Sequence, residues 1–396
     1  MIVRHFLQWV RTAEVCERAE ATSALARAYL HSDLTPDDRI AAEGAMIMLL
    51  DDPSPLVRQA LAEAIGSSRD APAAVVHALA NDQPHIAAIV LERSPLLLDS
   101  DLVDAIAVGG ADLQSAVARR MTLPRSVSAA LAEVGCAEAC LTLIENAGAD
   151  IAAFSLDRIV ARFGHLAAMR EALLAWPDLP IGIRQQLIVK LSETLVGFVT
   201  ARDWMEEGRA QRIAQEASEK ATVILASSAE SISPLVSHLR QTGQLTAGLV
   251  LRSLLSGNID FFEQALAELA ALPVSRVAAL VHDRRAAGFK AIYERAELPA
   301  SVYPAFRAAI EAMREDGLQA DFGGNTRLRR RMVERVLSSC ARLSAADLEP
   351  LLSLLRRYAT EAAREEARLF CDDLVEMGDM SHIVPANDTG RAVIAA

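Results

Sequence analysis

The amino-acid sequence predicts an all-α protein, an α-solenoid of stacked helix pairs followed by further C-terminal helices. Hydrophobic residues make up 52% of the 396 residues, whereas aromatic residues make up only 4%. Ala and Leu, which are good helix formers, supply most of the apolar content. Alternating runs of β-branched residues are nearly absent, which argues against a sheet. Apolar residues instead recur at helical spacing, and this pattern repeats along the first half of the chain.

Two early helix starts are each marked by a capping residue followed by proline. Thr35 precedes Pro36 and two acidic residues, and Ser54 precedes Pro55. A hydroxyl at the N-cap, proline at the first helical position and acids in the first turn all favour a helix start. We therefore expect a helix to begin at each proline, and we expect the second helix to end at Gly66.

A degenerate repeat begins with the second of these helices. Its copies start at Pro55, Pro84, Ala111 and Ala137, which are 29, 27 and 26 residues apart. A shorter apolar helix lies between successive starts, with the i, i+4 pairs Val75/Leu79, Leu102/Ile106, Val127/Leu131 and Leu156/Val160. Because one such helix pair cannot cover both of its own apolar stripes, stacking on its neighbours must cover them.

The chain is predicted to contain four regions, and paired glycines in the segment 321–326 mark the clearest linker. They are a HEAT-like helical repeat array at 1–200, a second helical region at 201–320, a C-terminal helical hairpin at 326–375 and a disordered tail at 378–396.

Three local features are expected within the second region. Helices are expected over residues 260–272 and 275–287. Glu216 and Lys220 are expected to form an ion pair on an exposed helix face, because they lie four residues apart.

Two resemblances support the repeat interpretation. The run DDPSPLVR at 51–58 resembles the unit signature of HEAT repeats, which stack helix pairs into curved scaffolds. Its surroundings resemble the alphaproteobacterial family of uncharacterised proteins known as DUF2336, most densely over about residues 25–135. The segments that carry this second resemblance are LARAYL at 25–30, the capped start at Thr35, DAP at 70–72, ALAND at 78–82, VLERSPLL at 90–97 and DLV at 101–103. The family implies a helical fold with HEAT-like repeats and no agreed activity, so it assigns no catalytic residue.

The sequence contains no motif that predicts an enzyme, a cofactor or a metal centre. A Gly-x-Gly-x-x-Gly turn, a phosphate loop and a Gly-x-Ser-x-Gly elbow are all missing. Cys136 and Cys140 lie four residues apart, but a closed zinc site needs four ligands, so we interpret them as core thiols. We therefore expect no catalytic residue, no cofactor and no metal site.

Two groups of charged residues are candidates for binding a partner. The first occupies the polar ninth and tenth positions of the repeats, which would line one surface of a stacked array: Glu92, Arg93, Arg119 and Arg120. The second opens the C-terminal hairpin: Arg327, Arg329, Arg330, Arg331 and Arg335. Arginine clusters suit phosphates, nucleic acid or an acidic protein face. The alternatives are the solvated ends of amphipathic helices for the first group and a salt-bridged hairpin for the second.

These features favour a non-enzymatic scaffold that mediates protein–protein interaction and could serve in regulation. The alternative is a HEAT-like protein that binds nucleic acid. The net charge of −12 disfavours nucleic acid as the main partner. The five cysteines do not form a disulfide framework, so we expect reduced thiols in a cytoplasmic protein. No run approaches 18 consecutive apolar residues, so we expect no membrane span.

Overall fold

The computed structural model describes residues 8–10, 12–283, 286–316, 324–341 and 349–380. Over these residues the chain is helical, apart from loops and one isolated bridge between Leu123 and Ala149. The prediction of an all-α protein is therefore confirmed. The chain divides into two compact units, Met1–Phe198 (unit 1) and Val199–Ala396 (unit 2), and the division falls within helix α13 (Ile181–Thr200).

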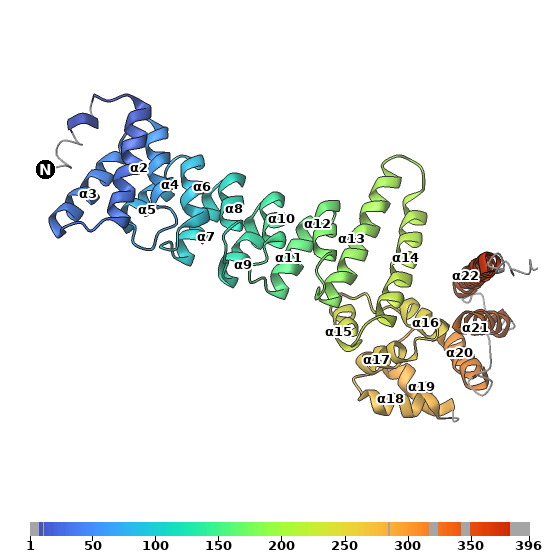
Figure 1. The fold of residues 1–396 in the computed structure, drawn as a ribbon. Coiled ribbons are helices and arrows are strands. Elements are labelled where there is room, and N and C mark those ends of the chain that lie inside the picture. The colour runs from blue at the N-terminus through green and yellow to red at the C-terminus, as the bar shows by residue number, and fades with distance from the viewer. Residues whose placement is uncertain (1–7, 11, 284–285, 317–323, 342–348, 381–396) are drawn as a thin grey trace, which may run out of the picture. The chain divides into compact units, whose positions relative to one another are not determined.

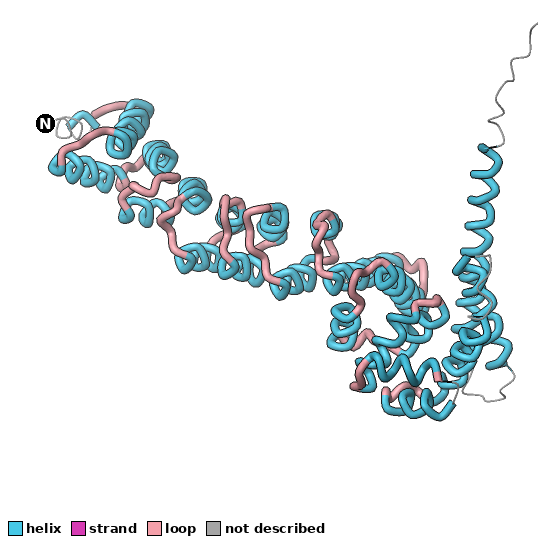
Figure 2. Tube along the Cα trace, turned by 60° about the horizontal axis from the view of Figure 1, so that its bottom comes forward, coloured by secondary structure: helices cyan, strands magenta, loops and turns pink. Residues whose placement is uncertain are grey.

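Unit 1 consists of two rows of short helices that alternate along the sequence (Figure 1). Row A contains α2 (Val15–His31), α4 (Pro55–Ile65), α6 (Pro84–Arg93), α8 (Ala111–Ala118), α10 (Ala137–Glu145) and α12 (Ala167–Leu174). Row B contains α3 (Pro36–Leu49), α5 (Ala73–Ala80), α7 (Asp99–Val108), α9 (Arg125–Val134) and α11 (Ala153–Phe163). Each row A helix packs on the next one in that row, and in row B α9 packs between α7 and α11 (Figure 2).

The repeat starts predicted from the sequence coincide with the first residues of α4, α6, α8 and α10. The seventh residue of each copy is fully buried, and these residues are Leu61, Val90, Val117 and Leu143. The i, i+4 pairs of the intervening helices α5, α7, α9 and α11 are buried as well. Because both rows contribute to one continuous core, each repeat is covered by its neighbours.

The two proline-marked helix starts are capped in different ways. The Thr35 hydroxyl accepts a hydrogen bond from the Asp38 amide at 3.2 Å, as the sequence predicts for an N-cap. The Ser54 hydroxyl makes no such bond. Instead, the Ser54 amide donates to Oδ1 of Asp52 at 2.8 Å, so the aspartate organises this turn.

Side chains from one repeat satisfy the last carbonyl groups of helices in the preceding repeat. The Arg120 guanidinium donates to the carbonyls of Leu91 and Ser94, at 2.5 and 2.7 Å, at the end of α6. Asn146 likewise donates to the carbonyls of Ala118 and Arg120 at the end of α8, both at 2.7 Å. The final carbonyls of a helix have no intrahelical donor. These contacts therefore satisfy the helix ends and fix the register of neighbouring repeats.

Unit 2 is a bundle of longer and less regular helices. It contains α14 (Glu207–Ser227), α15 (Ser233–Gln241), α16 (Ala247–Leu255), α17 (Ile259–Ala270), α18 (Val274–His282), α19 (Ala286–Arg295), the 3-10 turn η1 (Ala300–Val302), α20 (Tyr303–Asp316), α21 (Gly324–Ala341) and α22 (Glu349–Met380). Helix α16 contacts α14, α17, α20 and α21, and α21 packs between α20 and α22.

The core of unit 2 contains most of the aromatic packing in the described residues. The rings of Phe262 and Phe306 stack with centroids 6.1 Å apart, and Tyr293 packs edge-on to Tyr303 at 5.0 Å. The Tyr293 hydroxyl donates to the Pro299 carbonyl at 2.6 Å. Buried rings contribute large apolar area, and a buried tyrosine hydroxyl needs a partner. This cluster therefore joins α17, α19 and α20 into one core.

Two helix boundaries in unit 2 differ from those expected. The helix predicted over 275–287 is wrong, because α18 ends at His282 and α19 begins at Ala286. The Arg314 guanidinium donates to the carbonyls of Val281 and Asp283, both at 2.5 Å, and this long-range cap stabilises the break. Helix α22 continues to Met380, past the start of the tail predicted at 378–396, and residues 381–396 lie outside the described residues.

Adjacent arginines at the end of α8 offer a direct test of the inter-repeat contacts. Arg120→Ala removes both bonds to the α6 carbonyls and should lower the free energy of unfolding by about 1–3 kcal/mol. Arg119→Ala removes only an exposed contact to Glu92 and should cost less than about 0.5 kcal/mol. Urea denaturation followed by circular dichroism measures both. Equal losses in the two variants would show that the carbonyl contacts do not stabilise the array.

Candidate functional site

Three of the four repeat residues proposed to bind a partner lie on one accessible edge of row A. Glu92 and Arg93 end α6, and Arg119 follows the last residue of α8. Oε2 of Glu92 lies 3.1 Å from Nε of Arg119, so the contact joins neighbouring repeats. The side chains of Arg93 and Arg119 are about half exposed, at 51% and 49%. This edge therefore presents accessible charges of both signs.

Arg120, the fourth residue of this group, is placed differently. Its guanidinium is directed into the array, where it binds the carbonyls of Leu91 and Ser94. Burial lowers the pKa of this guanidinium. Arg120 is thus part of the framework that holds α6 and α8 together, and Glu92, Arg93 and Arg119 remain the surface candidates.

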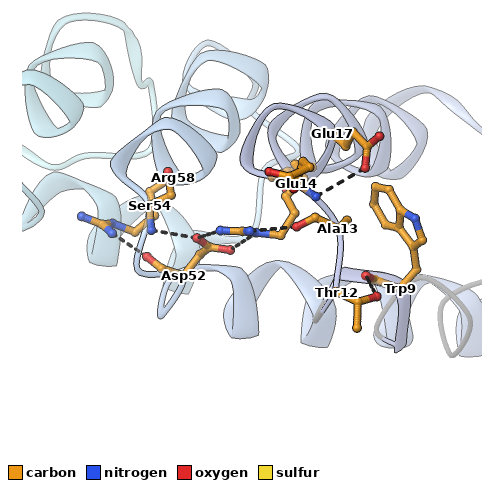
Figure 3. Close-up of polar contacts among 10 residues, drawn as sticks. Trp9, Thr12, Ala13, Glu14, Glu17, Asp52, Ser54 and Arg58 are labelled. Carbon is orange, nitrogen blue, oxygen red and sulfur yellow. Dashed lines mark hydrogen bonds and ion pairs between the residues drawn. The ribbon is translucent and has the colours of Figure 1, made fainter.

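A denser polar network lies at the N-terminal end of unit 1 (Figure 3). Oδ1 and Oδ2 of Asp52 accept two hydrogen bonds from the Arg18 guanidinium, both at 2.9 Å. Nη1 of Arg58 donates to the Asp52 carbonyl at 2.6 Å, and its other nitrogens reach the Asp82 carboxylate at 2.7 and 3.0 Å. Figure 3 shows Asp52 beside Ser54 and Arg58, with its contacts drawn as dashed lines. Arg18, Asp52, Arg58 and Asp82 therefore link α2, the turn before α4, α4 itself and the turn before α6.

Both aspartates of this network are held in their charged form. Burial opposes the charge of Asp52, but hydrogen bonds from Arg18 and the Ser54 amide outweigh it and keep the pKa of Asp52 below its usual value. The pKa of Asp82 is lowered in the same way, against the effect of burial, by Arg58 and the Gln83 amide. Since all these hydrogen bonds stay within the chain, the network is a structural element of the repeat array.

The arginine group of the C-terminal hairpin is only partly open to partners. Arg330 forms ion pairs with Glu334 of α21 at 2.8 Å and with Glu366 of α22 at 3.0 Å. Arg331 and Arg335 are exposed on α21. The side chains of Arg327 and Arg329 lie outside the described residues. The hairpin thus combines a salt-bridged seam with at least two solvent-facing arginines.

A cluster of charged residues that the sequence did not predict joins α14, α16 and α22. Arg252 of α16 is only 6% exposed, and its Nη1 lies 2.9 Å from Oε2 of Glu361. The other oxygen of Glu361 lies 2.8 Å from Nζ of Lys220 on α14. The Arg252 guanidinium also lies over the Tyr358 ring, 4.1 Å from its centroid, which is a cation–π geometry. Glu361 is therefore shared between a buried and a half-exposed cation.

The charges of this cluster stabilise one another. Burial opposes the charge of Glu361, but Lys220 and Arg252 together lower its pKa. Burial likewise opposes the charge of Arg252, while Tyr358 and Glu361 raise its pKa. Burial raises the pKa of Glu219, whose carboxylate accepts a hydrogen bond from the Thr246 hydroxyl at 3.1 Å.

The expected Glu216–Lys220 pair on α14 is replaced by contacts to another helix. Lys220 pairs with Glu361, and Oε1 of Glu216 lies 2.9 Å from Nη2 of Arg357 on α22. Spacing within one helix could not reveal partners that lie more than a hundred residues away. Arg252 did carry a signal, because it is the only charged residue in the otherwise apolar helix Ala247–Leu255, where a buried charge requires a partner.

The two cysteines that could have served as metal ligands take different structural roles. Cys136 is the N-cap of α10, where its sulfur accepts from the Ala139 amide at 3.4 Å. Cys140 is fully buried, and burial raises the pKa of its thiol to about 11. Among the described residues no group of three or more His, Cys, Asp or Glu side chains is placed to hold a metal ion.

The helices were predicted to include no membrane span. Over the part of the chain that the structure describes, no single helix is both long and apolar enough to cross a membrane. Helices α17 and α18 together would be long and apolar enough to cross a membrane. However, the chain bends by 115° between them, and both helices contribute buried residues to the core of unit 2.

The geometry therefore defines an all-helical protein with a two-row repeat unit and a helical bundle. Within this class, the chain belongs to the DUF2336 family, described as uncharacterised proteins conserved in bacteria, which it matches over residues 86–346. The match extends far beyond residue 135, where we expected the resemblance to thin out. It begins after the HEAT-like run at residues 51–58. No curated protein and no solved structure shows a significant match to the chain.

The lowered pKa of Asp82 predicts acid sensitivity of the repeat array. Its charged form contributes stability above the unfolded-state pKa, and this contribution is lost as the pH falls through the lower folded-state pKa. Asp82→Asn should therefore destabilise the protein at neutral pH, on the order of 1–2 kcal/mol, and much less near pH 3.

Thermal denaturation at several pH values measures this difference. Asp70→Asn, at an exposed position between α4 and α5, is the control and should change little at any pH. A deficit in Asp82→Asn that is independent of pH would contradict the electrostatic explanation.

Proposed function

We propose that the chain is a non-enzymatic helical-repeat scaffold, of HEAT-like α-solenoid type, that binds another protein in the cytoplasm. The observation that carries this proposal is the two-row stacking of unit 1. Stacked repeats create an extended surface whose residues come from successive helices, and such surfaces suit protein partners. A regulatory role in bacteria agrees with the absence of recognisable catalytic motifs in the sequence.

The surface that best fits such a partner is the row A edge formed by Glu92, Arg93 and Arg119. These side chains come from two neighbouring repeats and are accessible, and their backbones are held by the buried contacts of Arg120. A partner would meet charges of both signs on a rigid support. Charges at an interface guide orientation and partner choice more than they raise affinity.

Nucleic-acid binding is the second candidate, and it rests on the exposed arginines of α21. Arg331 and Arg335 face solvent, and exposed arginines suit phosphate groups. Against this candidate stand the net charge of −12 and the pairing of Arg330 with two glutamates.

Affinity capture with charge-matched variants separates the two candidates. The tagged wild type would be compared with Arg93→Glu/Arg119→Glu and with Arg331→Glu/Arg335→Glu, each of which changes the net charge equally. We expect a specific protein, identified by mass spectrometry, to be retained by the wild type and by the α21 variant but lost from the row A variant.

Other outcomes would change the proposal. Recovery of nucleic acid alone, lost only from the α21 variant, would support the second candidate. A protein retained equally by all three chains would show that the partner binds elsewhere. Circular dichroism of each variant confirms that its helices are intact.

A further inference from the structure

Helix α22 packs along α21, where one ion pair joins Arg330 to Glu366, and it contacts α14 through ion pairs and α16 through Arg252. Towards α21, the helix buries Leu351 and Leu355, and α21 in turn buries Val336 and Cys340. Towards α14, its contacts are charged: Glu361 with Lys220 at 2.8 Å, and Arg357 with Glu216 at 2.9 Å. Apolar burial and the Arg330–Glu366 ion pair therefore join α22 to α21, whereas ion pairs join α22 to α14.

Open space beside these ion pairs supports the same distinction. An open cleft lies between α14 and α22 beside these ion pairs, and every residue that lines it is polar or charged. Thr360, Arg364, Glu365 and Arg368 extend this lining beyond the ion pairs themselves. A second, much smaller cleft lies between α16, α21 and α22, beside Glu361. Solvent can therefore reach the contacts that attach α22, and dissolved salt can screen them.

Glu361 is the residue on which this attachment depends most. Its two oxygens bind cations from two different helices, Lys220 on α14 and Arg252 on α16. Arg252 is 6% exposed, and α22 contributes Glu361 and the Tyr358 ring to the groups that cover it. A buried cation that loses its counter-charge is strongly unfavourable, so loss of Glu361 favours exposure of Arg252 to water.

We propose that α22 is a mobile cover held by charge, which shields Lys220 of α14 and Arg252 of α16 and moves away when the Glu361 contacts are broken. In the closed form Glu361 pairs with both Arg252 and Lys220. In the open form α22 moves away from α14, and both cations become accessible to solvent. This proposal is independent of the proposed function, because it concerns contacts within unit 2 and the proposed partner surface lies in unit 1.

The distance between α14 and α22 reports directly on this cover. Spin labels at Ala217→Cys and Ala367→Cys, both exposed positions, allow this distance to be measured by electron–electron double resonance. The accessible native thiols are first removed by Cys16→Ser, Cys136→Ser and Cys371→Ser, while Cys140 and Cys340 are buried. Serine at 136 retains a capping group for α10.

Glu361→Gln is the decisive variant, and Glu366→Gln is its matched control. Both remove one negative charge from α22, but Glu366 contacts Arg330 within the hairpin. We expect a single short distance in the wild type at low salt. We expect Glu361→Gln to raise the fraction of a longer distance at least about ten-fold, and Glu366→Gln to leave it unchanged. Circular dichroism and thermal denaturation verify that each variant is folded.

Salt provides a second test that needs no substitution in the cluster. Raising the salt from about 0.05 M to about 1 M reduces the Debye length to about 3 Å and should increase the longer distance in the wild type. If Glu361→Gln fails to fold, the salt titration of the wild type alone tests whether α22 moves away from α14. An unchanged short distance at all salt concentrations, or equal opening in Glu366→Gln, would overturn the proposal.

Discussion

The structure of unit 1 depends on one constraint: its helices are too short to be stable alone. Most span eight to eleven residues, whereas isolated helices below about 12–15 residues are marginal in water. Each helix must therefore bury its apolar stripe against others, and a single helix pair leaves part of that stripe uncovered. Packing each row A helix on the next solves this problem, and it explains why the core of unit 1 is continuous from α2 to α13.

Apolar stripes alone would allow neighbouring repeats to slide, and polar contacts between repeats oppose this. Arg58 with Asp82, Glu92 with Arg119, and Glu133 with Arg158 join residues that are 24, 27 and 25 positions apart. These separations are close to the spacing of the repeat starts. Arginines that bind helix-end carbonyls add a second, more buried set of contacts. Apolar burial thus drives the stacking, while the polar contacts set the register and add stability of their own.

Local sequence signals, such as capping residues, prolines and apolar spacing, made the helices predictable. Contacts between residues far apart in the sequence were not predictable in this way. Proline and capping residues placed the starts of α3 and α4, and the recurring apolar positions placed α6, α8 and α10. The break between α18 and α19 was missed because its cap comes from Arg314, more than thirty residues away. The cluster around Glu361 was missed for the same reason, since its members lie on three helices. Among the candidate partner residues, Arg120 was indistinguishable from Arg119 in sequence, although only Arg120 points into the array.

Polar contacts are predicted to couple neighbouring repeats, and a double-mutant cycle on Arg58 and Asp82 tests this coupling most directly. The free energy of unfolding would be measured for the wild type, Arg58→Ala, Asp82→Ala and the double variant. The structure predicts a favourable coupling energy of about 1 kcal/mol or more, because the two side chains share two hydrogen bonds that join α4 to the turn leading into the next repeat. Single-variant effects that add to within about 0.3 kcal/mol would show that the pair does not couple the repeats, and would contradict this account.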